Sequence, residues 1–129
     1  MHAAVRTAIL ALPVLLTGCM PGMHTSRPQF RGTVIATGTR EPVPGASVTV
    51  EPDSRGNPAR TVVTNSRGDF VIPRRKKFAI VFLMQYPYAN WDYVIRADAP
   101  GFFETSTEVS RVGPMPPKRV EKLQLELSG

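Results

Sequence analysis

The sequence is dominated by short apolar or alternating runs that are separated by proline and glycine. In residues 46–51, Ala46, Val48 and Val50 alternate with polar residues, so all three side chains lie on one face of a strand. Further β-rich runs follow at a spacing of about 8–12 residues. They cover residues 30–36, 60–65, 70–72, 78–84, 91–97, 102–110 and 120–127. Thirteen prolines and ten glycines are scattered between the runs, as turn residues are. We therefore predict an all-β fold, a seven- to eight-stranded Greek-key β-sandwich.

Two of these runs have special features. Residues 78–84 are continuously apolar, which predicts a strand buried on both faces or an inner strand of the sandwich. In residues 120–127, Leu123, Leu125 and Leu127 alternate with polar residues, which favours a closing strand. Composition alone also allows a helix in this last segment.

The N-terminus has the pattern of an export signal. Arg6 supplies positive charge, and the apolar run 8–16 is far shorter than the ~20 residues that a membrane-spanning helix needs. Leu16-Thr17-Gly18-Cys19 follows and resembles the lipobox of bacterial lipoproteins. The resemblance implies cleavage before Cys19 and acylation of its thiol, with fatty acids such as palmitate. The alternatives are an ordinary secretory signal with an incidental cysteine, or a cytoplasmic chain with an apolar start.

Cysteine content agrees with lipidation. Cys19 is the only cysteine, so no intramolecular disulfide can form, and acylation would consume the lone thiol. Two or three acyl chains would hold the protein firmly on a membrane. Met20 occupies the position where lipoproteins retained in the inner membrane carry aspartate. The resemblance therefore implies the outer membrane, facing the periplasm.

The expected organisation has three parts within one domain's worth of chain, 129 residues. Residues 1–18 are the signal peptide, 19–29 the acylated cysteine and a flexible tether, and 30–129 the β-domain. Residues 20–29 contain two prolines and no periodicity, so we expect them to be extended and mobile. Such a tether holds the domain within roughly 30 Å of the membrane.

Several motifs in the domain resemble the carboxypeptidase regulatory-like domain, which is related to collagen-adhesin B-type repeats. They are Gly32-Thr33-Val34, the segment 42–50 (PVPGASVTV), the segment 64–70 (TNSRGDF), the segment 97–102 (ADAPGF) and the alternating segment 123–127. The resemblance implies a transthyretin/prealbumin-like β-sandwich in which these residues form turns and core. Members of the family are mostly non-catalytic stalks, adaptors and modules that bind proteins or glycans. Residues 74–91 depart from the family pattern.

Catalytic chemistry is hard to assemble from this sequence. The histidines are His2 and His24, and both precede residue 30, so the β-domain has no histidine base and no His/Cys metal cluster. Transthyretin-like hydrolases that act on a purine-derived ring use histidines in the sheet, and those are missing here. Turn aspartates such as Asp53 and Asp69 more often bond to backbone than act as acids, although a carboxylate pair or calcium site is conceivable. We expect a non-enzyme without metal or cofactor.

A basic cluster is the first candidate interaction site. Arg74, Arg75, Lys76 and Lys77 are consecutive and are expected between two strands, where they could dock on anionic headgroups or an acidic protein. Alternatively they form a solvated loop, or protect the apolar run 78–84 from aggregation. The formal net charge of +6 is a mild excess, and nucleic acid is not an expected partner of an envelope protein.

An aromatic segment is the second candidate. Tyr86, Tyr88, Trp91 and Tyr93 lie within eight residues, and exposed aromatic rings stack on sugars or anchor interfaces. Alternation places Trp91 and Tyr93 on the same side of a strand. The alternative is that some of these rings are core and the others cover a loop.

The function expected from these features is that of a membrane-anchored, non-catalytic envelope lipoprotein. Its β-sandwich would act as a structural or protein-interaction module with an envelope protein as partner. A glycan-binding module that uses residues 86–93 on peptidoglycan or polysaccharide is the alternative.

Overall fold

The computed structural model describes residues 19–82, 89–113 and 115–129, and these residues form strands and connecting loops. The nine strands are β1 (Cys19–Arg27), β2 (Gln29–Ala36), β3 (Ser47–Val50), β4 (Arg60–Val63), β5 (Asp69–Ile72), β6 (Arg75–Phe82), β7 (Ala89–Asp98), β8 (Thr105–Gly113) and β9 (Arg119–Leu127). The predicted all-β fold is confirmed. Within the described ranges, no helix has the length and apolar content that crossing a membrane requires.

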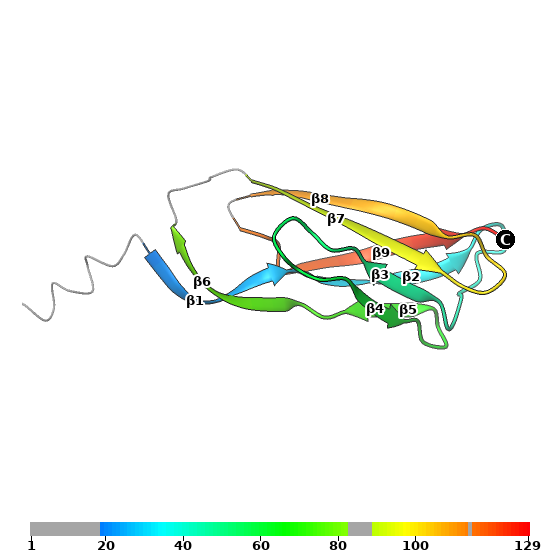
Figure 1. Ribbon diagram of the computed structural model, residues 1–129. Helices are drawn as coiled ribbons and strands as arrows, with labels where there is room; N and C mark the ends of the chain where they lie inside the picture. Colours follow the sequence, from blue (N-terminus) through cyan, green and yellow to red (C-terminus); the bar gives the residue numbers. More distant parts are fainter. Residues whose placement is uncertain (1–18, 83–88, 114) are drawn as a thin grey trace, which may run out of the picture.

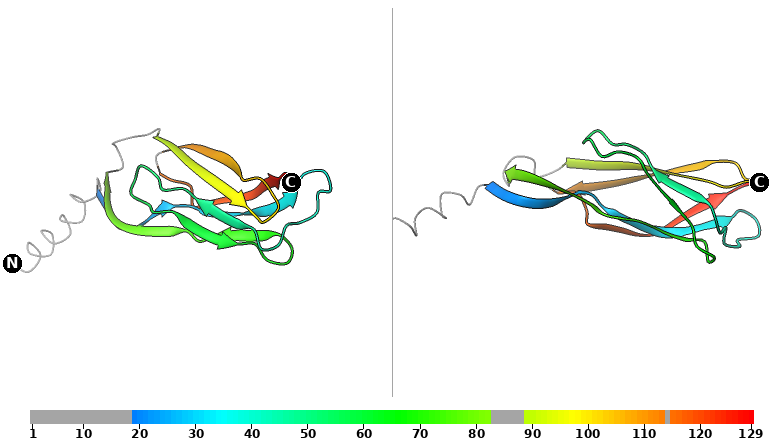
Figure 2. Two further views of the ribbon diagram at one scale, coloured as in Figure 1. Left: turned by 45° about the vertical axis from the view of Figure 1, so that its right-hand side comes forward. Right: turned by 60° about the horizontal axis from the view of Figure 1, so that its bottom comes forward.

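Seven strands form two sheets that pack face to face (Figures 1 and 2). One sheet has the order β5-β2-β9 and the other β4-β3-β7-β8. The sheets enclose one core, to which both contribute: Phe30, Val34, Val43, Ala46, Val48, Val50, Phe70, Ile72, Tyr93, Ile95, Ala97, Val109, Val120, Leu125 and Leu127. The β-sandwich is therefore confirmed, with more strands in the chain than we predicted.

The core follows the alternation seen in the sequence. Val48 and Val50 of β3 are fully buried, as are Ile95 and Ala97 of the neighbouring β7. At one end of the core, the ring of Phe30 meets the ring of Tyr93 edge to face, with 5.3 Å between centroids. The closing strand β9 lies parallel to β2, the strand expected at residues 30–36.

The remaining two strands form a ribbon that projects from one end of the sandwich, away from the C-terminus (Figures 1 and 2). β1 pairs with β6 in antiparallel fashion, from Cys19↔Phe82 to Arg27↔Arg75. Arg27 precedes Phe30 by three residues, and Arg75 follows Ile72 by three residues, so the pair Arg27↔Arg75 is in the same register as the pair Phe30↔Ile72 between β2 and β5. The ribbon is therefore an extension of the β2–β5 ladder beyond the sandwich.

The ribbon corrects two sequence-based predictions. Residues 20–29 are not an unpaired tether, because nearly all of them belong to β1 and the start of β2. β1 pairs with a strand far along the chain, from Arg27↔Arg75 to Cys19↔Phe82, and no local pattern predicts such a partner. Arg75, Lys76 and Lys77 are not a loop either, because β6 begins at Arg75.

The apolar run at 78–84 also differs from expectation in its described part. It was predicted to be a strand buried on both faces or an inner strand of the sandwich. Instead, residues up to Phe82 belong to the two-stranded ribbon, and the Phe78 side chain is 65% exposed. The Phe78 side chain is therefore not part of the sandwich core. Residues 83 and 84 lie outside the described residues.

Candidate interaction surfaces

The basic cluster is split by the geometry of β6. Arg74 and Lys76 line a surface groove, whereas Arg75 pairs across the ribbon with Arg27, and Lys77 with His24. Successive residues of a strand point to opposite faces, so the four cations cannot act as one patch. The sequence-based prediction of a single four-residue site is thus reduced to Arg74 and Lys76.

Two further cations complete this groove, which we call the basic groove. It is lined by Arg74, Lys76, Lys118 and Arg119, together with Gln29. No carboxylate lines it, and none of its four cations forms an ion pair with a described residue. Arg119 is the first residue of β9 and Lys118 directly precedes it. Both reach the groove because Arg119 pairs with Gln29 in the parallel β2–β9 ladder.

Arg75 has a different environment, beside a buried cation. Arg27 is 4% exposed, and its Nη1 donates a hydrogen bond of 2.8 Å to the carbonyl oxygen of Pro58. Burial, and then the nearby charge of Arg75, lowers the pKa of Arg27. Among the described residues, Arg27 Nε and Arg75 Nη1 are buried and without a hydrogen-bond partner. Arg75 therefore belongs to the junction between ribbon and sandwich.

The aromatic segment is also divided. Tyr93 is 2% exposed and packs on Phe30, so this candidate interaction residue is a core residue. As the alternation predicted, Trp91 lies on the same side of β7. It is half-buried and packs against the core. Its Nε1 donates to the carbonyl oxygen of Gly113 at 3.0 Å. Tyr86 and Tyr88 lie outside the described residues.

An arginine covers the remaining face of Trp91. The Arg55 guanidinium carbon lies 3.9 Å from the ring centroid, in cation–π geometry, and Arg55 Nη2 donates to the carbonyl oxygen of Asn90 at 2.7 Å. Arg55 is held there by a turn in which Asp53 Oδ1 accepts hydrogen bonds from the backbone N–H groups of Arg55 and Asn57. Asp53 is thus a backbone-bonding turn residue, as expected.

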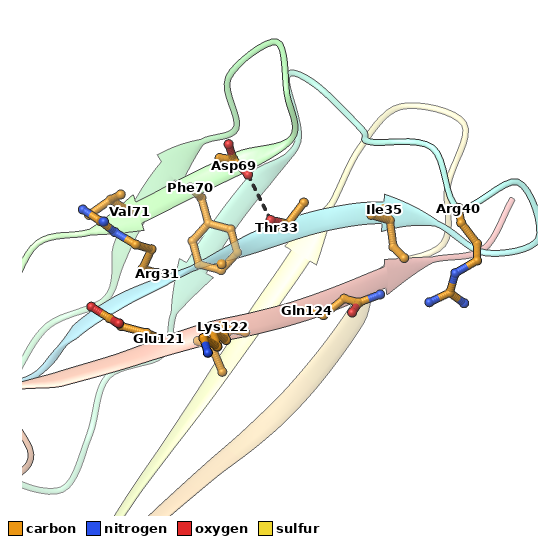
Figure 3. A pocket seen from close by; sticks show the side chains of 12 residues that line it. Arg31, Thr33, Ile35, Arg40, Asp69, Phe70, Val71, Glu121, Lys122 and Gln124 are labelled. Atoms are coloured by element: carbon orange, nitrogen blue, oxygen red, sulfur yellow. Dashed lines mark hydrogen bonds between the residues drawn. The ribbon is translucent and has the colours of Figure 1, made fainter.

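A second groove lies on the outer face of the β5-β2-β9 sheet and was not predicted (Figure 3). We call it the outer-sheet groove. β2 contributes Arg31, Thr33 and Ile35 to it. Its other lining residues are Gly32, Arg40, Asp69, Phe70, Val71, Glu121, Lys122, Leu123 and Gln124. The only sequence signal for it was that residues 31, 33 and 35 alternate with the core residues of β2.

Charges of both signs surround this groove. Arg31, Arg40 and Lys122 are cationic, and Asp69 and Glu121 are anionic (Figure 3). Asp69 Oδ1 accepts a hydrogen bond from Thr33 Oγ1 across the β2–β5 ladder at 2.9 Å. Val71, which is 40% exposed, adds an apolar element. Such a mixed surface resembles a protein-binding surface more than a site for one small ion.

Metal-ligand groups do not gather in the described part of the chain. There, no three His, Cys, Asp or Glu side chains lie close enough together to hold a metal ion. His24 lies in β1 opposite Lys77, not in an unstructured tether.

No protein-family model matches this chain, and a search of curated proteins gives no significant match. A solved structure that is similar to it is the 5-hydroxyisourate hydrolase of Klebsiella pneumoniae. The two chains are 12% identical, with a TM-score of 0.39, and the match covers 84% of this chain and 93% of that one. A match at this level assigns no activity, substrate or ligand to this chain.

Proposed function

We propose that this protein is a lipid-anchored, non-catalytic envelope lipoprotein with a carboxypeptidase regulatory-like β-sandwich that binds another protein. The observation that carries the anchor is the sequence Leu16-Thr17-Gly18-Cys19 after a short apolar run. The cysteine content supports it, because Cys19 is the only cysteine of the chain and acylation would consume its thiol.

The position of Cys19 has a consequence for the anchored protein. Cys19 is the first residue of β1, and its backbone pairs with that of Phe82 in the ribbon. The anchor would therefore be attached directly to a paired strand. In the anchored protein the ribbon end of the molecule would lie nearest the membrane. The protein would be located in the outer membrane and face the periplasm.

Mass spectrometry of the membrane-extracted protein tests the anchor. We expect an N-terminus at Cys19 with a diacylglyceryl modification, and release of a Cys19→Ser variant from the membrane fraction. A Met20→Ser variant is the control, because it keeps the cysteine and should remain anchored and acylated. A mature N-terminus elsewhere, or an unmodified Cys19, would contradict the lipoprotein proposal.

The outer-sheet groove is the surface that best supports a protein-binding role. It combines charges of both signs with exposed apolar area, and it is built on three paired strands, which hold its side chains in place. The acidic and basic residues could meet complementary charges on a partner, which favours one orientation of binding.

Site-specific crosslinking in cells tests this role. A photoreactive residue at Gln124, exposed in the groove, should yield a discrete crosslinked envelope protein. The matched control places the same residue at Ser106, which is exposed on β8 of the other sheet. Equal products from both positions, or none from Gln124, would count against a partner at this groove.

The alternative of glycan binding through residues 86–93 has less support. Tyr93 is buried, and Arg55 covers the ring of Trp91, so neither presents a free aromatic face to a sugar. Binding to peptidoglycan or polysaccharide that is lost in Trp91→Ala but retained in Phe103→Ala would restore this alternative. Phe103 is a suitable control because it is 71% exposed and lies outside the aromatic segment.

A further inference from the structure

The ribbon carries exposed apolar side chains next to the basic groove. Met23 of β1 and Phe78 of β6 are directly paired, and they are 61% and 65% exposed. Paired residues of an antiparallel ladder lie on the same face, so their side chains form one apolar patch. Exposed apolar patches that border polar residues commonly mark protein or membrane contacts.

The apolar patch and the basic groove share a face of the ribbon. Lys76 lies two residues before Phe78 in β6, and side chains two apart in a strand point to the same side. Lys76 is also a lining residue of the basic groove. Along this face, the side chains change from apolar at Phe78 to cationic at Lys76, and then to the cations at the base of the ribbon.

From this arrangement we propose that the β1–β6 ribbon lies on an anionic bilayer surface. Met23 and Phe78 would enter the interface between headgroups and acyl chains, and the basic groove would bind headgroup phosphates. Charge complementarity favours this occupant, because the groove has four exposed cations and no lining carboxylate. Apolar groups beside cations are the combination that interfacial elements use.

The place of the ribbon in the molecule agrees with this inference. The ribbon projects from the end of the sandwich opposite the C-terminus (Figure 1). Met23 follows Cys19 by four residues, a separation of roughly 13 Å in a strand. The inference rests on the proposed function for the position of the membrane, since an acylated Cys19 would bring this face to the bilayer. Contact of the ribbon with the bilayer would also keep the domain close to the membrane, which a mobile tether would not do.

Vesicle binding without the lipid separates this inference from the lipoprotein proposal. The probe protein is residues 19–129, which contain all nine described strands, with Cys19→Ser so that no acyl group is attached. Its binding is measured by co-sedimentation with vesicles of phosphatidylcholine, and with vesicles of phosphatidylcholine and phosphatidylglycerol in equimolar amounts. We expect binding to the anionic vesicles alone, weakening as salt is added.

Charge variants test the basic groove. Each cation near an anionic surface strengthens binding by about fivefold, so Lys76→Ser/Lys118→Ser/Arg119→Ser should weaken it by about 100-fold. The control Arg60→Ser/Arg67→Ser/Arg111→Ser removes the same charge from exposed positions on the sandwich that line neither groove, and should have a much smaller effect. Equal weakening by the two triple variants would overturn the proposal, since net charge alone would then explain binding.

Apolar variants test the patch. Met23→Ser/Phe78→Ser should weaken vesicle binding by about tenfold, because both side chains lose contact with the interface. The control Phe103→Ser/Val112→Ser removes two similarly exposed apolar side chains, 71% and 67% exposed, elsewhere on the domain. Thermal unfolding of each variant shows whether its fold is kept.

Two further outcomes would reject the inference. The first is an absence of binding to anionic vesicles by the parent protein. The second is displacement from the vesicles by inorganic phosphate at an ionic strength where sodium chloride has no effect, which would make the groove a site for free phosphate. Neither outcome bears on acylation of Cys19, which the mass spectrum decides separately.

Discussion

Gly32 of β2 and Leu123 of β9 approach so closely that no side chain fits between them. A β-carbon built on Gly32 would lie 2.7 Å from Cβ of Leu123, and closer still to the Leu123 carbonyl oxygen. The cause is a β-bulge in β9. Between the pairs Phe30↔Val120 and Gly32↔Leu123, β2 has one residue and β9 has two, and Lys122 adopts a left-handed φ of 60°.

This close approach predicts a large effect of Gly32→Ala. The methyl group would meet the β9 backbone, which cannot move aside as a flexible side chain can, so we expect a loss of stability of about 1–3 kcal/mol. Urea unfolding of the variant measures it. Gly113→Ala is the control, because its β-carbon would meet only the Met115 carbonyl oxygen at 3.7 Å. A stability change no larger than that of the control would refute the steric argument.

A second prediction concerns Thr64, whose buried hydroxyl joins two segments of the sandwich. Thr64 Oγ1 donates to the carbonyl oxygen of Val43 at 2.7 Å and accepts from the N–H of Ala46 at 2.9 Å. Thr64→Val keeps the shape but removes both bonds, so we expect it to destabilise the protein by about 1–3 kcal/mol. Thr64→Ser retains the hydroxyl and should lose less. Urea unfolding in which serine proves the more damaging substitution would contradict this explanation.

Local patterns were sufficient for strands in which apolar and polar residues alternate. Val48 and Val50 alternate with polar neighbours, and β3 was predicted within one or two residues. The turn glycines were also predictable, since Gly45 and Gly68 have φ of 71° and 74°.

Long-range pairing accounts for what the sequence could not predict. The sequence of β1 contains proline and has no strand-like alternation. It forms a strand because its backbone pairs with that of β6. Lys118 and Arg119 join Arg74 and Lys76 only because β9 runs parallel to β2. Alternation placed Trp91 and Tyr93 on one side of β7, but only the packing of the two sheets shows that this side faces the core.

Arg55 and Trp91 give a prediction with a spectroscopic readout. Trp91 is the only tryptophan, so its emission reports this contact alone. Arg55→Ala should expose the ring, which would shift the emission to longer wavelength and increase quenching by iodide. The stability loss should be small, about 0.5–1 kcal/mol, as for a cation–π pair near the surface. Arg67→Ala is the control, and an unchanged spectrum in Arg55→Ala would show that the guanidinium does not cover the ring.

The last prediction follows from the buried hydroxyl of Tyr93. Among the described residues, this hydroxyl is buried and lacks a hydrogen-bond partner, and burial raises the pKa of Tyr93 to about 12. Folding therefore favours the neutral phenol of Tyr93 over the charged phenolate. In the unfolded chain the pKa is about 10. The raised pKa thus contributes stability fully below about pH 10, and that contribution is lost as the pH rises towards 12.

A Tyr93→Phe variant isolates this effect. With pKa values of about 10 in the unfolded chain and about 12 in the folded protein, the parent protein should lose about 2 kcal/mol more stability than Tyr93→Phe between pH 9 and pH 12. At pH 7 the variant should be as stable as the parent, because it removes a buried polar atom that has no partner among the described residues. Urea unfolding of both proteins across this pH range measures the difference. Parallel stability curves for the two proteins would show that the Tyr93 hydroxyl ionises as readily when folded as when unfolded.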